Sequence, residues 1–327
     1  MRLVPNLWYA ILESKEVKPG KLLGVTRMGV KLVFWRDNEG TIQCIADRCV
    51  HRGASLSAGK IVGDNIQCPF HGFEYDGAGS CKRIPSNGRA TLIPHNYVAP
   101  SYVVRENHGF IWIWWGEKRK DYPDIKFFEN LDDSFSISSF QSLWRSHYSR
   151  AIENQLDVAH VPFVHSSTIG RGRRTLVNGP GCRLDGDSLY VYPRNEVDNG
   201  QKPLKPNEVD PNNSGNYLHF IFPNIWQNYI SDKLRVVVAF APIDEDNTMM
   251  YIRQYQKMIR IPILKHAFDA LGKTFNRIVA NQDKPVVEAQ FPKKSSLDIG
   301  ELLVQADWPI ILYRKRIKEL GEYEVRK

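Results

Sequence analysis

The sequence predicts an α+β protein, in which an all-β N-terminal domain is followed by a domain that combines an antiparallel sheet with helices. Short segments rich in Val, Ile and aromatic residues, separated by Gly-containing turns, fill the first third of the chain and are typical of strands. The later part joins further strand-like segments to apolar residues at helical spacing. The charged stretch KRKDYPDIK lies between the two parts, so we expect domains at residues 6–117 and 118–327.

Composition restricts the class of protein. The chain has 327 residues, of which 42% are hydrophobic and 24% charged, as is ordinary for a globular protein of two domains. No apolar run approaches the roughly 20 residues that span a bilayer, and the start lacks a secretory signal, so we expect a cytoplasmic protein without a membrane partner. The net charge of +8 is spread along the chain and accompanies no nucleic-acid-binding motif, so we expect no nucleic-acid partner.

Four segments of the first domain are predicted as strands, because β-branched and aromatic residues dominate each of them. They are KLLGVTRM, VKLVFWRD, TIQCIADRC and GFIWIWWGE, the last of which covers Gly109–Glu117. We expect these strands to form a scaffold from which functional loops project.

The second domain begins with a predicted helix in RAIENQLDVAHVPF, where Ile152, Leu156 and Ala159 recur at helical spacing and Pro162 should end or kink the helix. The polar segment Arg194–Asn216 is rich in Pro and Asn and is predicted as a surface loop. Three strand-like segments follow, YLHFIFPNIWQNYI, LRVVVAFAPI and MMYIRQYQKM. The next segment, RIPILKHAFDALGKTFNRIVANQDKPVVEAQF, is predicted to be largely helical.

Two short motifs each bring a cysteine close to a histidine, Cys49-x-His51 and Cys68-x-x-His71. Two thiolates and two imidazoles can hold one zinc ion tetrahedrally. The same four side chains also suit a Rieske cluster, in which two Cys hold one iron and two His hold the other.

The residues around these motifs favour the cluster. Gly53 and Gly72 follow the Cys/His pairs closely, where a loop must fold tightly around a bound group. The odd number of cysteines, five in all, argues against a disulfide framework. We expect the other three, Cys44, Cys81 and Cys182, to be small buried residues.

The order, separation and following glycines of the two motifs resemble the Rieske domain, and CVHRGA and HGFEYD are similar to the oxygenase branch of that family. The segments NLWYA, GFIWIWWG, FPNIWQN and WPIILYRKRIKEL extend the resemblance to the homotrimeric α subunits of the vanillate O-demethylase and dicamba monooxygenase group. This resemblance implies a Rieske domain followed by a helix-grip (Bet v 1-like) catalytic domain. It also implies a 2Fe–2S cluster held by Cys49, His51, Cys68 and His71, and a mononuclear Fe(II).

The segment ENQLDVAHVPFVH offers ligands for that second iron. Asp157 and His160 are three residues apart and share a face of the predicted helix, and a break at Pro162 lets His165 turn back towards His160. Taken alone, the spacing also fits a helix with one core histidine and one capping histidine. By the resemblance, His160 and His165 are iron ligands, and a late carboxylate completes a face that leaves positions open for O₂.

The late carboxylate is expected on a helix near the C-terminus. The resemblance points to Asp283, the first member of a D-x-x-x-x-E-x-Q stretch that continues with Glu288 and Gln290. Glu288 is expected to form a structural salt bridge instead. Pro285 is compatible with a helix N-terminus or a kink.

Two further residues receive catalytic roles from the resemblance. Asp157 is expected to accept a hydrogen bond from His160 and, in the trimer, from His71 of the next subunit, which would fix both rings. Asn154, one helical turn earlier, is expected near the iron, and an exposed asparagine is the simpler alternative.

The resemblance implies an enzyme rather than a carrier. A ferredoxin or flavin reductase would supply electrons through the cluster to the mononuclear iron, where O₂ would hydroxylate or oxidatively demethylate a small aromatic or heterocyclic substrate. A Rieske electron carrier with a non-catalytic second domain is the alternative, although such a domain would not need its full ligand set. Candidates for the substrate pocket, each of which could instead be core, are Trp226, Asn228, Phe222, His219, Ile278 and Val279.

Overall fold

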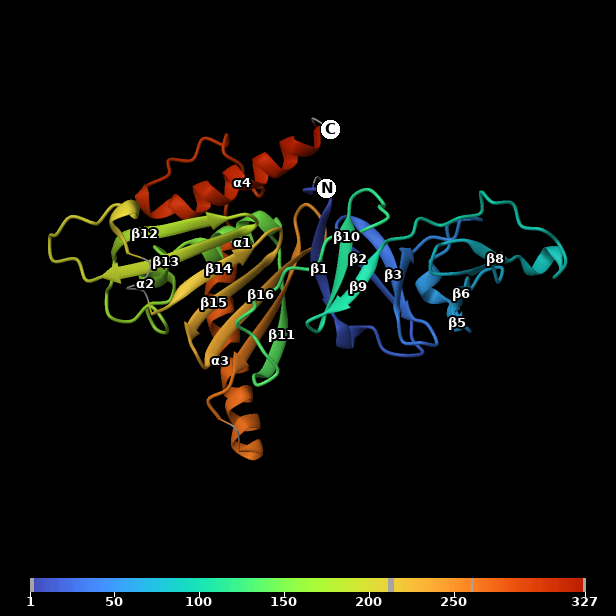
Figure 1. The fold of residues 1–327 in the computed structure, drawn as a ribbon, viewed down its shortest axis with the longest axis horizontal. Helices are drawn as coiled ribbons and strands as arrows, with labels where there is room; N and C mark the ends of the chain where they lie inside the picture. The colour runs from blue at the N-terminus through green and yellow to red at the C-terminus, as the bar shows by residue number, and fades with distance from the viewer. Residues whose placement is uncertain (1–2, 211–214, 260, 326–327) are drawn as a thin grey trace. The chain divides into compact units, whose positions relative to one another are not determined.

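The protein is described by a computed structural model, which covers residues 3–210, 215–259 and 261–325 (Figure 1). The chain divides into two compact units, one ending at Ile125 and the other beginning at Lys126. This division falls later in the chain than the expected boundary after Glu117. None of the described helices is long and apolar enough to cross a membrane.

Unit 1 is built from three small antiparallel sheets, which matches the all-β prediction for this part of the chain. The first has the order β1-β10-β9, with β1 at Leu7–Glu13, β9 at Val104–Asn107 and β10 at Phe110–Trp115. The second has the order β2-β3-β4, with β2 at Leu23–Arg27, β3 at Val30–Arg36 and β4 at Ile42–Ala46. The third has the order β5-β6-β7-β8, with bounds Lys60–Val62, Asn65–Gln67, Glu74–Tyr75 and Cys81–Arg83.

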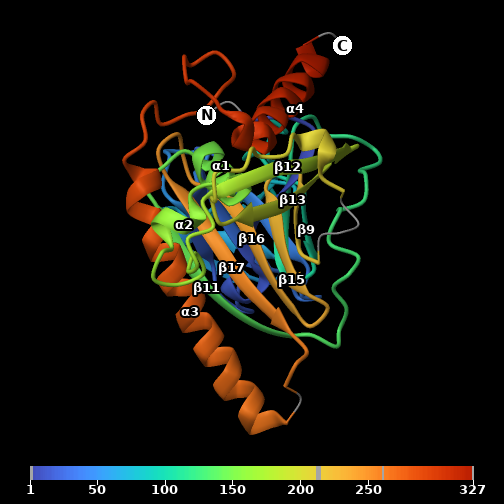
Figure 2. The same cartoon turned by 90° about the vertical axis from the view of Figure 1, so that its left-hand side faces the viewer.

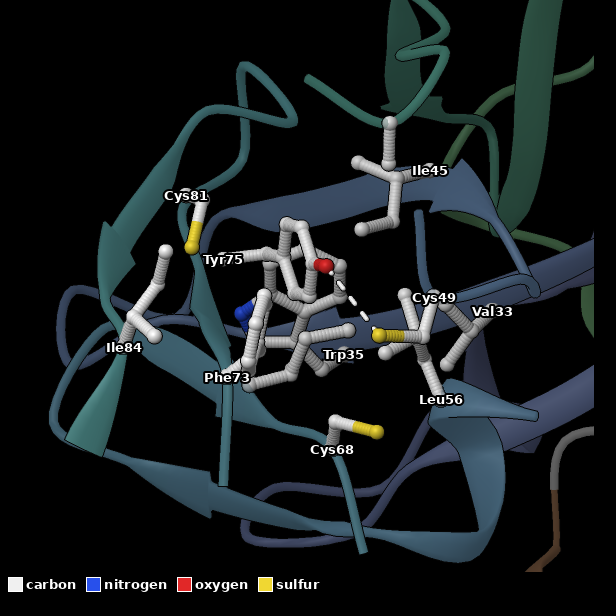
Figure 3. Packing of buried hydrophobic residues seen from close by; sticks show 12 residues of the cluster. Val33, Trp35, Ile45, Cys49, Leu56, Cys68, Phe73, Tyr75, Cys81 and Ile84 are labelled. Carbon is white, nitrogen blue, oxygen red and sulfur yellow. Dashed lines mark hydrogen bonds between the residues drawn. The ribbon is translucent and has the colours of Figure 1, made fainter. Parts of the chain in front are cut away.

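A buried cluster of apolar side chains joins the second and third sheets (Figure 3). Trp35 of β3 and Tyr75 of β7 are its largest members, and both are fully buried. The Trp35 indole N–H donates to the carbonyl of Asp64 at 2.9 Å, so its polar edge is satisfied. Burial of each large apolar side chain contributes about 1.5–3 kcal/mol, so this core fixes the two loops that leave β4 and β6.

Unit 2 contains a seven-stranded antiparallel sheet with the order β11-β17-β16-β15-β14-β13-β12 (Figure 2). Its strands, in chain order, are Ser136–Trp144, Leu176–Asp185, Ser188–Glu196, Tyr217–Ile221, Ile225–Ser231, Leu234–Pro242 and Thr248–Gln256. The prediction of an antiparallel sheet with helices is therefore confirmed.

Among the described residues, four α-helices accompany this sheet: α1 at Tyr148–Leu156, α2 at Val161–Val164, α3 at Pro262–Glu288 and α4 at Trp308–Val325. Helix α3 contacts β11 and β17, α1 contacts β16, and α4 contacts β12 and β13 (Figures 1 and 2). The predicted helical segment between residues 260 and 291 corresponds to α3, and Pro285 lies inside the helix, close to its end.

A network of charged side chains, of which Arg150, Glu153 and Arg314 are buried, joins α1 to α4. The guanidinium of Arg314 in α4 donates to both carboxylate oxygens of Glu153 in α1, at 2.7 and 3.0 Å. Arg150 lies 3.2 Å from the same carboxylate, and Glu301 binds Arg150 at 2.8 Å and Arg314 at 2.7 Å. Because each charge has a partner of opposite sign, the network holds two helices in one arrangement.

Several predicted boundaries differ from the structure. The segment FIFPNIWQN is not one strand, because residues 222–224 form the turn between β14 and β15. The predicted loop Arg194–Asn216 starts too early, since β13 continues to Glu196, and its residues 211–214 lie outside the described part. The strands β11, β12 and β13 had no prediction, because their Ser, Gly and Pro residues obscure the apolar alternation.

Candidate metal centres and cavity

The two loops that leave β4 and β6, here called the cluster loops (residues 47–55 and 68–73), carry the Cys/His motifs. Cys49 and Cys68 are buried, each with 2% of its surface exposed, whereas His51 and His71 are exposed. The two imidazole rings lie with their centroids 4.6 Å apart. The cluster loops thus present two thiols on the inside and two imidazoles on the outside.

Tight turns shape both cluster loops. Gly53 donates its N–H to the carbonyl of Cys49 at 2.9 Å, and Gly72 donates to that of Cys68 at 3.1 Å. Both glycines have a φ of +75°, which side chains with a Cβ rarely adopt. At Gly72, a Cβ would also lie only 2.9 Å from the ring of Pro85. Glycine is therefore required at this position for two independent reasons.

The thiol of Cys49 has a hydrogen-bond partner in the core of unit 1. The Tyr75 hydroxyl lies 3.2 Å from Cys49 Sγ, as the dashed line in Figure 3 shows, and accepts from the Val50 N–H at 3.3 Å. Either group can donate while Cys49 is a thiol, but only the Tyr75 O–H can donate once Cys49 is a thiolate bound to metal. Burial, with the neighbouring Cys49 thiol as a further cause, raises the pKa of the Cys68 thiol.

The arrangement of these four side chains fits a two-iron cluster better than one zinc ion. A tetrahedral zinc ion at about 2.0–2.3 Å from each ligand would draw all four ligand atoms to within about 4 Å of one another. In the described part of the chain, the only group of at least three His, Cys, Asp or Glu with ligand atoms within 4.8 Å of one another lies in unit 2. An inner sulfur pair and an outer nitrogen pair are what a 2Fe–2S cluster of the Rieske type requires.

In unit 2, the helix predicted through Ala159 ends earlier than expected. Helix α1 stops at Leu156, and Asp157 follows with an extended backbone (φ −73°, ψ 129°). The Asp157 carboxylate accepts the N–H of Ala159 at 2.6 Å, a local turn that competes with the helix. Asp157 and His160 therefore do not share a helix face, and Pro162 lies in the first turn of α2 instead of ending α1.

Three side chains nevertheless converge, and we call His160, His165 and Asp283 the triad. Their ligand atoms all lie within 4.8 Å of one another. Asp283 Oδ1 is 2.9 Å from His165 Nε2 and 3.4 Å from His160 Nε2. His160 precedes α2, His165 follows it, and Asp283 projects from α3, so three different backbone positions supply the triad.

A glutamine that was not predicted from the sequence fixes the orientation of one histidine of the triad. His165 Nδ1 lies 2.9 Å from the Oε1 of Gln282, and this amide oxygen can only accept, so Nδ1 carries the hydrogen. The same oxygen accepts from the Thr168 hydroxyl at 2.8 Å, and the Gln282 Nε2 donates to Ser167 at 3.1 Å. Its position beside Asp283 was the only signal available in the sequence.

The tautomer of His165 bears on what the triad can bind. With its hydrogen on Nδ1, His165 turns a bare lone pair at Nε2 towards Asp283 Oδ1, which is buried and has no hydrogen-bond partner. Two facing lone pairs need a cation or a proton between them. The residues therefore fit a divalent metal held by two imidazoles and one carboxylate.

The electrostatics of the triad also favour positive charge. Although burial lowers it, the carboxylates of Asp157 and Asp283 raise the pKa of His160 to about 9. Burial alone would raise the pKa of Asp283, but the neighbouring imidazoles of His160 and His165 hold it below the usual range. Asp157 Oδ2 lies 3.5 Å from His160 Nδ1, close to the contact expected for a group that orients this ring.

The triad opens into a cavity of about 550 Å³, a size typical of small-molecule sites. Of the predicted pocket residues, Trp226, Asn228 and Val279 line it. The other three do not. Phe222 stacks on Tyr313, His219 stacks on Tyr190, and Ile278 is exposed to solvent.

Asn154 lines the same cavity and is only partly exposed, so the alternative of an exposed surface asparagine is wrong. Glu288 lies outside the triad. It accepts the N–H of Arg145 at 2.8 Å and lies 3.9 Å from Lys284, in line with a structural role. Cys44 and Cys81 are buried as expected, whereas Cys182 is partly exposed.

Known families match both units. Residues 7–102 match the Rieske [2Fe-2S] domain family, and residues 144–323 match the vanillate O-demethylase oxygenase C-terminal domain family. The second match covers more than half of the chain. It contains the whole triad, and the first match contains both cluster loops.

Individual relatives extend these matches. The chain is 29% identical over 331 residues to the methylxanthine N1-demethylase NdmA of Pseudomonas putida, covering 97% of this chain and 89% of the relative. The solved structure of NdmA superposes with a TM-score of 0.79 and 25% identity, covering 98% of this chain and 92% of that one. Dicamba monooxygenase bound to dicamba has the same fold, with a TM-score of 0.79, 20% identity and full coverage of both chains.

A chloroplast relative is considerably longer. Protein TIC 55 of Arabidopsis thaliana is 30% identical over 224 residues, which are 68% of this chain and 40% of the relative. The chain spans only 58% of the corresponding protein of Pisum sativum. Both relatives therefore have sequence outside the stretch that matches this chain.

Proposed function

This chain belongs to the Rieske non-haem iron oxygenases of the α-subunit type, and we propose that it is the oxygenase component of an electron-transfer system that oxidises a small aromatic or heterocyclic molecule. The observation that carries this proposal is the triad at the edge of a substrate-sized cavity. Two imidazoles and one carboxylate on one face leave the remaining coordination positions open.

We assign a ligand role to seven side chains. His160, His165 and Asp283 would hold a mononuclear Fe(II), and the 2Fe–2S cluster would be held by Cys49, His51, Cys68 and His71. When bound, the cluster supplies single electrons and the mononuclear iron supplies the centre at which O₂ is activated.

Three further side chains would then orient the iron ligands or lie beside the iron. The Gln282 amide keeps the His165 ring in one tautomer with Nε2 facing the other ligands. Asp157, three-quarters buried, would accept the Nδ1–H of His160 and, across the assembly, a hydrogen bond from the partner subunit's His71. Asn154, with its amide nitrogen unpaired in the cavity, would lie beside the iron without binding it.

The proposed partners follow from the exposure of the cluster loops. His51 and His71 are exposed, so a ferredoxin or flavin reductase and a neighbouring subunit can each approach the cluster edge. The excess of +8 charge would assist docking of an acidic donor. We propose a homotrimer working in the cytoplasm, where the five free cysteines would stay reduced.

The reaction would be hydroxylation or oxidative demethylation. The names of the relatives include N-demethylases of methylxanthines and a monooxygenase of toluene-4-sulfonate, so both outcomes occur among proteins similar to this chain. Domain limits at residues 6–117 and 118–327 remain part of this proposal.

The test is oxygen uptake by the iron-replete protein supplied with a reductase, NADH and a panel of aromatic and heterocyclic compounds. We expect substrate-dependent uptake together with a reduced-state EPR signal of a Rieske cluster. A protein with the EPR signal but no affinity for ferrous ion would instead be the electron carrier with a non-catalytic second domain. A protein that contains only zinc would contradict both functions.

A further inference from the structure

The floor of the cavity is one face of the sheet in unit 2. Trp226 and Asn228 are two residues apart on β15, so their side chains lie on the same face of the sheet. Val238 and Ile252 continue the row that starts at Trp226, because Trp226 pairs with Val238 and Val238 pairs with Ile252. This flat, mostly apolar surface suits a planar ring, with Phe275 of α3 forming part of the opposite wall.

A buried donor in this floor has no partner. Trp226 is 5% exposed, and within the described part of the chain its indole N–H makes no hydrogen bond. Buried N–H groups are almost always paired, so this donor is available to an acceptor on a molecule that enters the cavity. The indole can only donate, which selects a ligand that carries an acceptor.

Arginines give the cavity an uncompensated positive charge. Arg171 and Arg174 both line it, and among the described residues neither has a carboxylate within ion-pair distance. Arg171 donates its Nε to the Ser167 carbonyl at 2.8 Å, which leaves its two terminal nitrogens available. Arg194 also lines the cavity, but its Nε lies 3.1 Å from Glu196.

The acidic side chains of the cavity do not balance these arginines. Asp283 Oδ1 faces both triad histidines and would be a metal ligand, and Asp157 accepts the Ala159 N–H and lies 3.5 Å from His160 Nδ1. Arg171 and Arg174 are therefore the charged groups of the described lining that lack a partner of opposite sign, and the Trp226 N–H is a buried donor without a partner.

We infer that the substrate is an aromatic or heterocyclic anion whose carboxylate or sulfonate is bound by Arg171 and Arg174. Its ring lies on the floor and an acceptor on it faces the Trp226 indole. Guanidinium groups bind such oxyanions with two parallel hydrogen bonds, so recognition depends on charge and geometry together. This inference rests on the proposed function and adds the substrate class.

Binding can be tested without turnover. The iron-replete protein is titrated anaerobically by calorimetry with benzoate, phenylacetate and 2-naphthoate, each compared with its neutral carboxamide. We expect at least one acid to bind about tenfold or more tightly than its carboxamide, the preference that one charge-assisted hydrogen bond gives. The inference is overturned if every carboxamide binds as tightly as its acid.

Variants test whether Arg171 and Arg174 cause the preference for the acid over its carboxamide. Arg171→Gln with Arg174→Gln should bring the acid-to-amide ratio of affinities close to one, whereas Arg171→Lys with Arg174→Lys should keep most of it. Arg194→Gln is the matched control and should leave the ratio unchanged, because Arg194 is already paired. Trp226→Phe keeps the ring but removes the N–H, and should weaken acid and amide alike. Equal loss of the ratio in Arg194→Gln and in the double Gln variant would refute the assignment.

The oxygenase function and the anion site can be refuted independently of each other. If the acids bind as expected but no compound supports oxygen uptake, the oxygenase function is wrong and the anion site stands. If uptake is supported by neutral compounds and no acid is preferred, the function stands and the anion site is wrong.

Discussion

The cluster loops and the triad are both candidate iron sites, yet they are assembled in opposite ways. The cluster ligands lie between Cys49 and His71, on two neighbouring loops held by one apolar core. The triad joins residues on either side of α2 to Asp283 on α3, far along the chain. A site built from local turns is readable as a motif, whereas a site built from distant elements depends on packing and on supporting side chains.

The largest expected effect separates the two sites. Asp283→Ala should lower oxygenation at least about a thousandfold, because a ligand that supports several kcal/mol of metal chemistry is removed. The visible absorbance and EPR signal of the cluster should be unchanged, since unit 1 is not altered. Glu288→Gln, on the same helix but outside the triad, is the control. Loss of the cluster signal in Asp283→Ala would mean that the two sites are not independent.

The second-largest effect is expected for Gln282, the side chain that orients a histidine of the triad. Gln282→Leu should lower the affinity for ferrous ion by about 10–100-fold, because the His165 ring loses the acceptor that sets its tautomer. Competition with a chromophoric chelator measures this without turnover. Lys284→Leu alters the other neighbour of Asp283 and should leave the affinity within twofold or so of wild type. An unchanged affinity in Gln282→Leu would show that the triad needs no such support.

Acid should lower the stability of unit 2 through one buried histidine. Burial, with Arg183 as a further cause, lowers the pKa of His219 in unit 2 to about 4. The unfolded state therefore binds the proton first, and the stability that this group contributes is full above pH 6.5 and is lost as the pH falls towards 4. Each pH unit changes the free energy of unfolding by about 1.4 kcal/mol, so about 2 kcal/mol should be lost between pH 6.5 and 5.

The measurement is urea unfolding of wild type and His219→Gln at pH 7 and pH 5, followed by circular dichroism. The variant keeps a group able to bond with Ser188, and its stability should depend less on pH than that of wild type. His266→Gln changes an exposed histidine of the same unit and should behave as wild type. Equal pH dependence in all three proteins would contradict the assignment.

The smallest effect lies at the cluster. Tyr75→Phe removes the O–H that points at Cys49 Sγ, and so removes a hydrogen bond that favours the more electron-rich, reduced cluster. The reduction potential should fall by about 40 mV, which corresponds to one hydrogen bond of about 1 kcal/mol. Protein-film voltammetry measures it. Tyr97→Phe, which alters a neighbouring aromatic of the same core, should leave the potential unchanged.

The difference between the two sites also explains what could be read from the sequence. Both Cys/His motifs, the strands β2, β3, β4 and β10 of unit 1 and helix α3 follow from local patterns. The early end of α1 does not, because the Asp157 side chain forms its own turn, which apolar spacing cannot reveal. Gln282 and the two arginines of the cavity lack any motif, and only the folded chain brings them beside the ligands.

The buried charges between α1 and α4 have a consequence at a distance. In the described chain no residue of α4 lines the cavity, but Arg314 neutralises Glu153, one residue before Asn154 on the helix that ends at the cavity. Proteolytic trimming that removes α4 would take away the two Arg314 contacts and leave Arg150 to balance the buried Glu153 carboxylate. A shortened enzyme would then lose its activity while retaining every group that touches iron or substrate.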